Sequence, residues 1–279
     1  MMNPIISIVI VNYNYGRFIE DAIRSVVSQD GFDQCELIVV DGGSSDNSVE
    51  VIKKYASRIA WWVSEKDNGQ SDAFNKGFSH ARGQLGCWVN ADDLLLPGTL
   101  RAVLDYCKNH PNCEWITGGV VFFNDQMKIW KMRIGTWITK RMHQWVDATV
   151  VGGPSSFFSL KRLREVGGFD VGLRYVMDSD LWHKFFACGM RMNHLPRYFW
   201  GFRMHQESKT AHSLTGKKQS RFKHEDKILQ SRYAVSKCLR VRVCALLFWK
   251  VFNGSLVRSY FDTMHYCGQN IFNYCGGEI

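Results

Sequence analysis

The chain has 279 residues, enough to bury a substantial core in one large domain or in two closely joined ones. Its hydrophobic fraction of 46% and charged fraction of 22% are those of a folded globular protein, which argues against a largely disordered chain. The formal net charge of +9 indicates an anionic partner. Nucleic acid, an acidic membrane surface and phosphate-bearing substrates are the candidates at this point.

The spacing of the cysteines and the lengths of the apolar runs indicate the cellular compartment. Nine cysteines without a C-x-x-C pair predict free thiols in a reducing compartment. The apolar run 5–11 is ended by Asn12 too early for a signal peptide, and no stretch approaches the ~20 apolar residues that span a bilayer. We therefore expect a cytoplasmic protein, with peripheral contact to the inner face of the plasma membrane as an open alternative.

The first hundred or so residues alternate strand and helix signals. Short apolar runs rich in β-branched residues are typical of strands buried on both faces, and apolar residues at helical spacing follow each run. The expected strands are 5–11, 36–40, 59–63 and 85–89. Apolar residues at helical spacing fall within 19–27, 49–56, 73–81 and 100–107. Four such repeats predict a mostly parallel, doubly wound α/β sheet.

Beyond residue 115 the sequence no longer alternates strand and helix signals. Segments 120–123 and 129–132 flank Asn124-Asp125 and predict a hairpin, and 181–188 predicts a helix. Residues 217–258 hold eleven lysines or arginines against two acids. A basic amphipathic helix resting on anionic lipid has this composition, and a docked C-terminal helix with a solvated basic face is the alternative.

Three polar clusters follow expected buried strands immediately, namely 12–14, 41–46 and 90–93. Because ligands of open α/β sheets bind outside the carboxyl ends of the strands, all three clusters should line one crevice. Ser44 or Ser45 is also placed to cap the second helix. In the third cluster, Asp92 and Asp93 repel each other unless a cation or hydrogen-bond donors compensate them. A divalent ion with oxygen ligands is one solution, and capping of the helix near Pro97 is the other.

Longer motifs surround these clusters and extend the pattern into the second half of the chain. They are Ser7–Asn14, Glu36–Asp46, Ser64–Gly77, Asn90–Asp93, Gly167–Asp170 and Asp178–Trp182. With these motifs in this order and spacing, residues 5–208 resemble the family 2 glycosyltransferases. That family has the GT-A fold and inverts the anomeric carbon, and the resemblance is to its bacterial polysaccharide-assembly members. The resemblance implies a nucleotide-sugar-binding α/β half (1–115), an acceptor-binding and catalytic-base half (116–215) and a basic C-terminal helical segment (216–279).

The resemblance also implies roles in donor binding. Nucleotide-sugar contacts would come from Asn12, Tyr13, Asp41, Asp67, Asn75 and Asp92. Tyr13 would lie against the base, Asp41 would hydrogen-bond the base or ribose, and Asp92 would face the ribose or the metal. Asp67 and Asn75 would stand near the diphosphate and the donor sugar. Where the family usually has proline and two acids, this chain has Val11, Gly42 and Asn90. Those departures leave the donor open, with UDP-sugars as the first expectation.

A divalent cation, Mn²⁺ or Mg²⁺, would accompany the donor. Asp93 is the foremost expected ligand and Asp92 the second. His205 would complete the metal shell or contact the diphosphate, and a satisfied loop histidine is the alternative. Two residues earlier, Arg203 would pair with phosphate or remain solvated. At neutral pH the leaving nucleoside diphosphate gains negative charge, which such an ion neutralises.

Asp178 falls where the family keeps its catalytic base. A carboxylate that removes the proton of the attacking hydroxyl accelerates such reactions by roughly 10²–10⁴-fold, and one in-line displacement inverts the anomeric carbon. The alternative is that Asp178 only caps the helix that contains Leu181.

The expected acceptor is a glycan or a lipid-linked glycan, and no nucleic acid is expected. Aromatic faces can stack on sugars, and the candidates are Trp137, Trp145 and Trp182, although core packing is the commoner use of tryptophan. A catalytically inactive glycan- or nucleotide-sugar-binding relative is the alternative function. A sugar-nucleotide pyrophosphorylase would need a glycine-rich basic loop after the first strand, and a dinucleotide-dependent oxidoreductase would need G-x-G-x-x-G; this sequence has neither.

Overall fold

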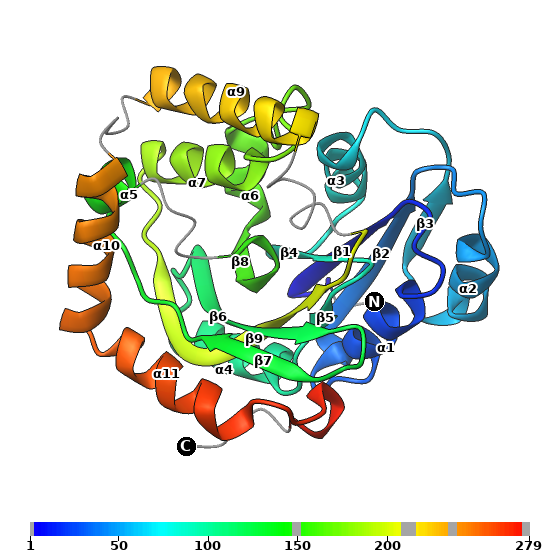
Figure 1. The fold of residues 1–279 in the computed structure, drawn as a ribbon. Helices are drawn as coiled ribbons and strands as arrows, with labels where there is room; N and C mark the ends of the chain where they lie inside the picture. Colours follow the sequence, from blue (N-terminus) through cyan, green and yellow to red (C-terminus); the bar gives the residue numbers. More distant parts are fainter. Residues whose placement is uncertain (1–2, 147–151, 208–215, 234–238, 275–279) are drawn as a thin grey trace.

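The structure, a computed structural model, describes residues 3–146, 152–207, 216–233 and 239–274. These residues form one nine-stranded sheet with helices on both faces (Figure 1). The strands are β1 Ile6–Asn12, β2 Cys35–Asp41, β3 Trp61–Ser64, β4 Leu85–Asn90, β5 Leu94–Leu95, β6 Trp115–Asn124, β7 Ile129–Arg133, β8 Ser156–Ser159 and β9 Asn193–Met204. The helices are α1 Ile19–Val27, α2 Ser48–Lys54, α3 Gln70–Ser79, α4 Thr99–Asn109, α5 Lys140–Val146, α6 Leu160–Glu165, α7 Met177–Ala187, α9 Gly216–Tyr233, α10 Leu239–Phe252 and α11 Ser255–Tyr266.

The strand order is β3-β2-β1-β4-β8-β6-β9-β5, and β7 pairs with β6 outside this path. The strands β3, β2, β1 and β4 are all parallel, as expected for the first half. The second half is mixed, because β8 runs antiparallel to both β4 and β6 while β9 is parallel to β6. The expected α/β architecture of the GT-A type is therefore confirmed, with a sheet that is parallel on one side only.

The core lies in two layers, one on each face of the sheet. Successive side chains of a strand point to opposite faces, so Ile8 and Ile10 pack with α1, α2 and α4, whereas Val9 and Val11 pack with α3 and α7. Figure 1 shows α3, α6, α7 and α9 on one face and α1 and α4 on the other. Burying each such side chain contributes about 1.5–3 kcal/mol. Two-sided burial fixes the register, and with it the place where each strand ends.

Local details differ from the sequence expectations at two helix starts. Neither Ser44 nor Ser45 caps α2, because Ser44 binds the Asp41 carboxylate instead, and Asp46 accepts the N–H of Ser48 at 3.0 Å. The helix expected at 181–188 begins four residues earlier, at Met177, which puts Asp178 in its first turn. The hairpin of β6 and β7 is confirmed.

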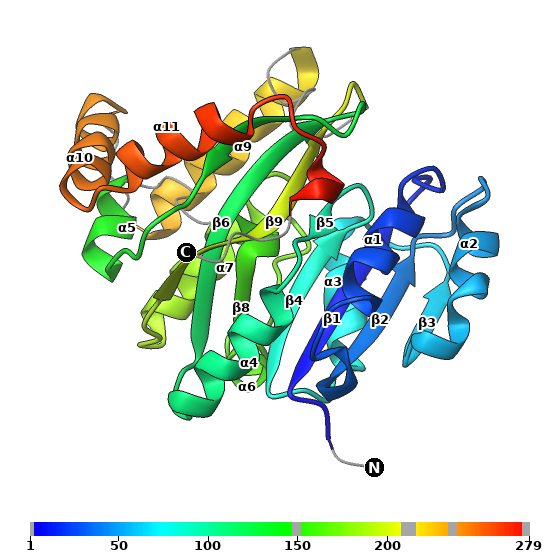
Figure 2. The ribbon, with the colours of Figure 1, turned by 90° about the horizontal axis from the view of Figure 1, so that it is seen from below.

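Three further features complete the fold. The helices α10 and α11 follow one another along the outside of β7 and α5 (Figure 2). Seven cysteines in the described ranges are free, and Cys244 and Cys267 among them are exposed. In the part of the chain that the structure describes, no helix is both long and apolar enough to cross a bilayer.

Candidate active site

A cavity of about 1170 Å³ opens at the carboxyl ends of β1, β2 and β4 and extends to β6, β7 and the corner between α10 and α11. Of the residues predicted to form a site, five line this cavity: Asn12, Tyr13, Asp67, Asp92 and Asp178. The other four lie behind its wall: Asp41, Asn75, Asp93 and His205. The strand-end clusters thus converge as expected, but only some of their carboxylates face the ligand space.

Asp41 organises the ends of β1 to β3. Its buried carboxylate accepts hydrogen bonds from Asn12 Nδ2 at 2.6 Å, Ser64 Oγ at 2.6 Å and the Ser44 N–H at 2.9 Å. With these donors in place, the Asp41 carboxylate holds the Asn12 side chain in position. The Oδ1 atom of Asn12 is buried without a hydrogen-bond partner among the described residues, and Asn12 lines the cavity. It is therefore an acceptor available to an N–H or O–H group of a ligand.

Tyr13, Gly42 and Asp67 form a compact wall beside Asn12. The Tyr13 side chain is 62% exposed, so its ring face is free to stack on a planar group. The N–H of Gly69 holds Asp67 Oδ1 at 2.8 Å. A β-carbon at residue 42 would lie 2.6 Å from an Asp67 carboxylate oxygen and 3.3 Å from the Tyr13 ring. Gly42 thus leaves room for the observed position of the Asp67 carboxylate, whereas the sequence had indicated only that its departure from the family motif leaves the donor open.

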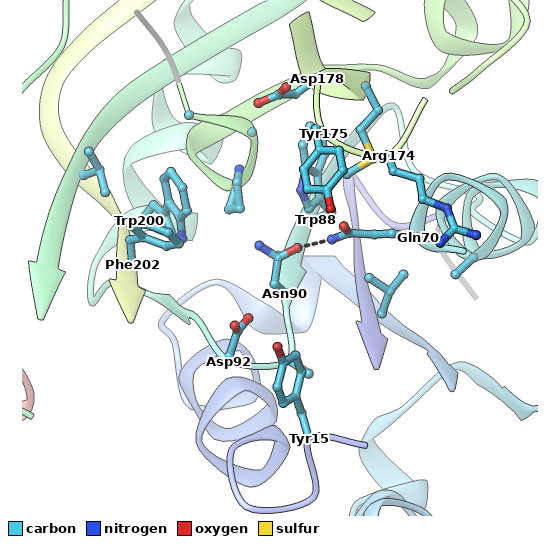
Figure 3. Close-up of a pocket in the computed structure, with 18 of the residues that line it drawn as sticks. Tyr15, Gln70, Trp88, Asn90, Asp92, Arg174, Tyr175, Asp178, Trp200 and Phe202 are labelled. Atoms are coloured by element: carbon cyan, nitrogen blue, oxygen red, sulfur yellow. Dashed lines mark hydrogen bonds between the residues drawn. The ribbon is translucent and has the colours of Figure 1, made fainter. Parts of the chain in front are cut away.

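The two acids of the Asn90–Asp93 cluster differ in their surroundings: Asp92 lines the cavity and Asp93 is buried behind it. The Asn90 amide accepts a hydrogen bond from Gln70 Nε2 at 2.9 Å (Figure 3). It also donates a hydrogen bond to Asp93 Oδ2 at 2.7 Å. Asp93 is fully buried and also accepts the N–H of Arg203 at 3.1 Å. Burial, followed by the nearby Asp92 charge, raises the pKa of Asp93 well above its usual range. Asp92 alone of the two acids faces the cavity.

His205 and Arg203 support Asp92 from behind. His205 Nε2 lies 3.0 Å from Asp92 Oδ2, and the imidazole packs between the rings of Tyr15 and Phe18. Arg203 is buried, donates to the Asp92 carbonyl at 2.9 Å and pairs with Asp21 at 2.9 Å. Both expectations for Arg203, a phosphate ligand or a solvated charge, are wrong, because its guanidinium is used inside the fold.

The cavity offers donor atoms suited to a hard divalent cation. Such ions are commonly bound by one or two carboxylates together with substrate phosphates. Asp92 supplies one cavity-facing carboxylate, with His205 adjacent to it. The described residues contain no group of three side chains that could hold a metal without further ligands. The donor set therefore fits a cation that shares its coordination sphere with a bound phosphate.

Asp178 enters the cavity from the side opposite Asp92 (Figure 3). Val176 is the N-cap residue of α7, and Asp178 lies in the first turn of this helix, where it contributes to helix capping by accepting a backbone N–H. Its Oδ1 accepts the N–H of Ser179 at 2.8 Å. Burial raises the pKa of Asp178 to about 6. A carboxylate of this kind is ionised at neutral pH and has increased basicity.

The loop before α7 is tied to two distant elements. Asn75 in α3 exchanges two hydrogen bonds with the backbone of Phe169, both of 2.8 Å. Glu225 in α9 accepts the N–H groups of Arg174 at 3.0 Å and Tyr175 at 2.7 Å. Asn75 thus joins α3 to the loop that leads to Asp178. Glu225 was not predicted, because it lies in a predominantly basic and polar segment without a recognisable motif.

The aromatic residues of the cavity differ from those expected. Trp182 is buried in the core, so the stacking hypothesis is wrong for it. Trp137 packs against Trp249 at 4.8 Å instead of lining the cavity, and the side chain of Trp145 lies outside the described residues. Trp200 and Phe202, which alternate on one face of β9, line the cavity instead (Figure 3).

The fold is that of a GT-A protein. The family model of glycosyl transferase family 2 matches residues 7–163, more than half of the chain. The chain belongs to this family. An uncharacterized glycosyltransferase of Rickettsia typhi is 26% identical over 195 residues, which are 66% of this chain and 59% of that protein. The chain thus spans about three fifths of the length of this relative.

Two solved structures share the fold. S. aureus TarS 1-349 in complex with UDP-GlcNAc matches with a TM-score of 0.60 and 16% identity, over 75% of this chain and 61% of that one. The mannosyltransferase PcManGT of Pyrobaculum calidifontis, in complex with GDP-Man and Mn²⁺, matches with a TM-score of 0.59 and 17% identity. That match covers 99% of this chain and 84% of the other.

Proposed function

We propose that this chain is an inverting glycosyltransferase that moves a sugar from a nucleoside diphosphate, UDP first, to a hydroxyl of a glycan or lipid-linked glycan. The observation that carries the proposal is that Asp92 and Asp178 face one cavity from opposite sides. A donor held at Asp92 would present its anomeric carbon toward Asp178. The complexes of TarS with UDP-GlcNAc and of PcManGT with GDP-Man support a nucleotide-sugar ligand for this fold.

The nucleotide would occupy the wall made by Asn12, Tyr13 and Asp67. The exposed Tyr13 ring offers a stacking face, and the unpartnered Asn12 Oδ1 offers a hydrogen-bond acceptor. Asp67 stands beside both on the same side of the cavity. In this proposal Asp41 and Asn75 act indirectly, the first by orienting Asn12 and the second by holding Phe169.

Asp178 would act as the general base. As the acceptor oxygen forms a bond to the anomeric carbon, its proton passes to the Asp178 carboxylate, and the bond from the anomeric carbon to the diphosphate oxygen breaks. The nucleoside diphosphate leaves with the bonding electron pair, and attack from the opposite side inverts the configuration. A base with a pKa near the working pH suits this step.

A divalent cation would be held by Asp92 and the donor diphosphate, with His205 beside it. When bound, such an ion neutralises the charge that develops on the leaving group. The PcManGT complex with Mn²⁺ supports a cation for this fold. In our proposal Asp92 takes the ligand role and Asp93 a supporting one, because Asp93 is buried and bound by Asn90 and Arg203.

Contact with an anionic membrane is the second part of the proposal. Ten large apolar side chains are exposed on α10 and α11, and eight of them form four adjacent pairs that recur every four or five residues. We call them the α10–α11 apolar surface: Val243, Leu247, Phe248, Val251, Phe252, Leu256, Val257, Tyr260, Phe261 and Met264. Such an exposed surface within a basic segment is typical of proteins that rest on anionic lipid.

The test is a panel of UDP-, GDP- and dTDP-sugars, scored for Mn²⁺-dependent binding and for hydrolysis of the donor. We expect one nucleotide class to bind and to be hydrolysed slowly without acceptor. Binding without any hydrolysis or transfer would favour the alternative, an inactive nucleotide-sugar-binding relative. Absence of binding by all three classes would overturn the proposal.

A further inference from the structure

One end of the cavity, at the corner between β7, α10 and α11, is lined by basic side chains. Arg133 at the end of β7 and Lys250 in α10 both line it, together with Ser255 at the start of α11. Figures 1 and 2 agree that α10 and α11 lie on the side of the molecule away from β2 and β3. Lys250 and Ser255, which these two helices carry, therefore lie on the side of the molecule away from β2.

Hydrogen bonds between the two helices and the β7 segment fix this corner. The edge N–H groups of Met132 and Ile134 donate to hydroxyls of α11, at 2.9 Å to Thr263 and 3.1 Å to Ser259. At the helix junction, Asn253 donates to Thr136 at 2.9 Å and accepts the N–H of Ser255 at 2.9 Å. The relative positions of β7, Lys250 and Ser255 are thus set by the fold.

Among the residues that the structure describes, the cations at this corner have no acidic partner. In the described ranges, no carboxylate lies within 4.0 Å of a charged nitrogen of Arg133, Lys250 or Lys131, the next basic residue of β7. The Arg133 guanidinium lies 5.4 Å from the centre of the Phe122 ring, and Phe122 also lines the cavity. Burial, and then the charges of Arg133 and Lys131, lower the pKa of Lys250. A bound anion would relieve this repulsion.

Ser255 adds an independent observation. Its side chain is 8% exposed, and its Oγ is a buried atom without a hydrogen-bond partner in the described part of the chain. The residue lines the cavity beside Lys250. Buried hydroxyls are normally satisfied by protein or water, so an unpartnered one at a cavity wall marks a place for a ligand oxygen.

We propose that Arg133, Lys250 and Ser255 bind a phosphate group of the acceptor. This inference rests on the proposed function, since it assumes that the donor occupies the other end of the cavity. Phosphate fits because its anionic oxygens form charge-assisted hydrogen bonds with cations and accept hydrogen bonds from hydroxyls, which are the groups present here. The donor diphosphate is the poorer occupant, because Asp92, the residue assigned to its cation, belongs to the opposite end. The acceptor phosphate can belong to a lipid carrier or to the glycan itself.

The experiment measures phosphate binding while UDP fills the donor end. Calorimetric titrations of the full chain with glycerol 3-phosphate and with farnesyl phosphate are made in saturating UDP and Mn²⁺. We expect both probes to bind, and Arg133→Gln or Lys250→Gln to weaken binding by about tenfold or more. Lys250→Arg should keep most of the affinity, and Ser255→Ala should lose less than either glutamine variant. Tighter binding of farnesyl phosphate indicates a lipid carrier, and equal binding indicates recognition of phosphate alone.

The controls separate this inference from the proposed function. Lys108→Gln removes the same charge from an exposed position on α4 and should leave phosphate affinity unchanged. UDP affinity is measured for each variant, and thermal unfolding establishes that each is folded. If UDP binds but neither phosphate probe does, or if Lys108→Gln loses as much as Lys250→Gln, the inference is overturned. If UDP itself does not bind, the proposed function fails instead.

Discussion

The carboxylate of Glu225 accepts the backbone N–H of Tyr175 at 2.7 Å, across 50 residues of sequence. Glu225 is 2% exposed, and the same oxygen accepts the N–H of Arg174 at 3.0 Å. Tyr175 is three residues before Asp178, and both line the cavity. The helix α9 thus positions the loop that leads to the proposed base.

Removal of the Glu225 carboxylate should therefore reduce transfer without removing the base. Glu225→Ala leaves two backbone N–H groups without their acceptor, which costs about 1–3 kcal/mol for each buried group. We expect kcat to fall on the order of tenfold or more, because small displacements of a catalytic group are costly. UDP affinity should change little. Arg221→Ala removes only the ion pair that the half-exposed Arg221 makes with Glu225 and keeps both backbone hydrogen bonds, so it is the matched control; an equal loss there would contradict the positioning role.

The rate of transfer should depend on pH through Asp178. Burial raises the pKa of this carboxyl to about 6, and the base must be ionised to accept a proton. At saturating donor the rate should thus be constant above pH 7 and fall tenfold per unit below pH 6. Asp178→Asn should lose roughly 10²–10⁴-fold in transfer and retain UDP binding. Asp105→Asn, at an exposed carboxyl of α4, should leave the profile unchanged. Full transfer by Asp178→Asn would rule out the assignment.

The two adjacent acids of the Asn90–Asp93 cluster should respond differently to removal of charge. Asp92→Asn takes away the cavity-facing carboxylate and should weaken Mn²⁺-dependent UDP binding by tenfold or more. Asp93→Asn should keep most of the metal dependence but lower the free energy of unfolding by about 1–3 kcal/mol, because its hydrogen bonds with Asn90 and Arg203 are disturbed. Titration with Mn²⁺ and thermal unfolding measure both effects. A larger loss of Mn²⁺-dependent UDP binding in Asp93→Asn than in Asp92→Asn would instead make Asp93 the metal ligand.

A methyl group at residue 42 should disturb donor binding through Asp67. In Gly42→Ala the new β-carbon would lie 2.6 Å from the Asp67 carboxylate, so Asp67 has to move away from Tyr13. We expect the dissociation constant for UDP to rise about tenfold, as for loss of one hydrogen bond to a charged group. A double-mutant cycle with Asp67→Ala is the control. If the two changes act through the same contact their effects will not add, and simple additivity would count against this mechanism.

The sequence predicted where in the fold the candidate site lies better than it predicted which side chains line the cavity. Buried strands followed at once by polar residues fix where β1, β2 and β4 end, and parallel pairing brings those ends together. Which carboxylate faces the cavity depends on distant partners, such as the Arg203 backbone that binds Asp93 across 110 residues. The strand β9, which carries Trp200 and Phe202, was missed because its mixed polar and aromatic sequence has no clear period. Contacts between residues so far apart in the sequence, and the pairing of β9 with β6, cannot be recognised from the neighbouring residues alone.

The α10–α11 apolar surface should decide whether the chain binds membranes. Phe248 and Phe252 are each 72% exposed and lie one turn apart, so their removal should not affect folding. In pelleting assays with vesicles containing anionic lipid we expect the chain to bind, and high salt to weaken binding. Inserting a phenylalanine side chain contributes about 1.5–3 kcal/mol, so Phe248→Ser with Phe252→Ser should reduce binding by tenfold or more.

The matched control for this surface is Phe272→Ser, which removes a ring that is also exposed but lies outside the two helices. Its vesicle binding should equal that of the unchanged chain. Donor hydrolysis without acceptor should be the same in all variants, because none of the three rings lines the cavity. Binding that is independent of anionic lipid and of the two α10 phenylalanines would exclude the membrane proposal. The apolar surface would then have to be covered by another protein, since so much exposed apolar area is unusual for a free surface.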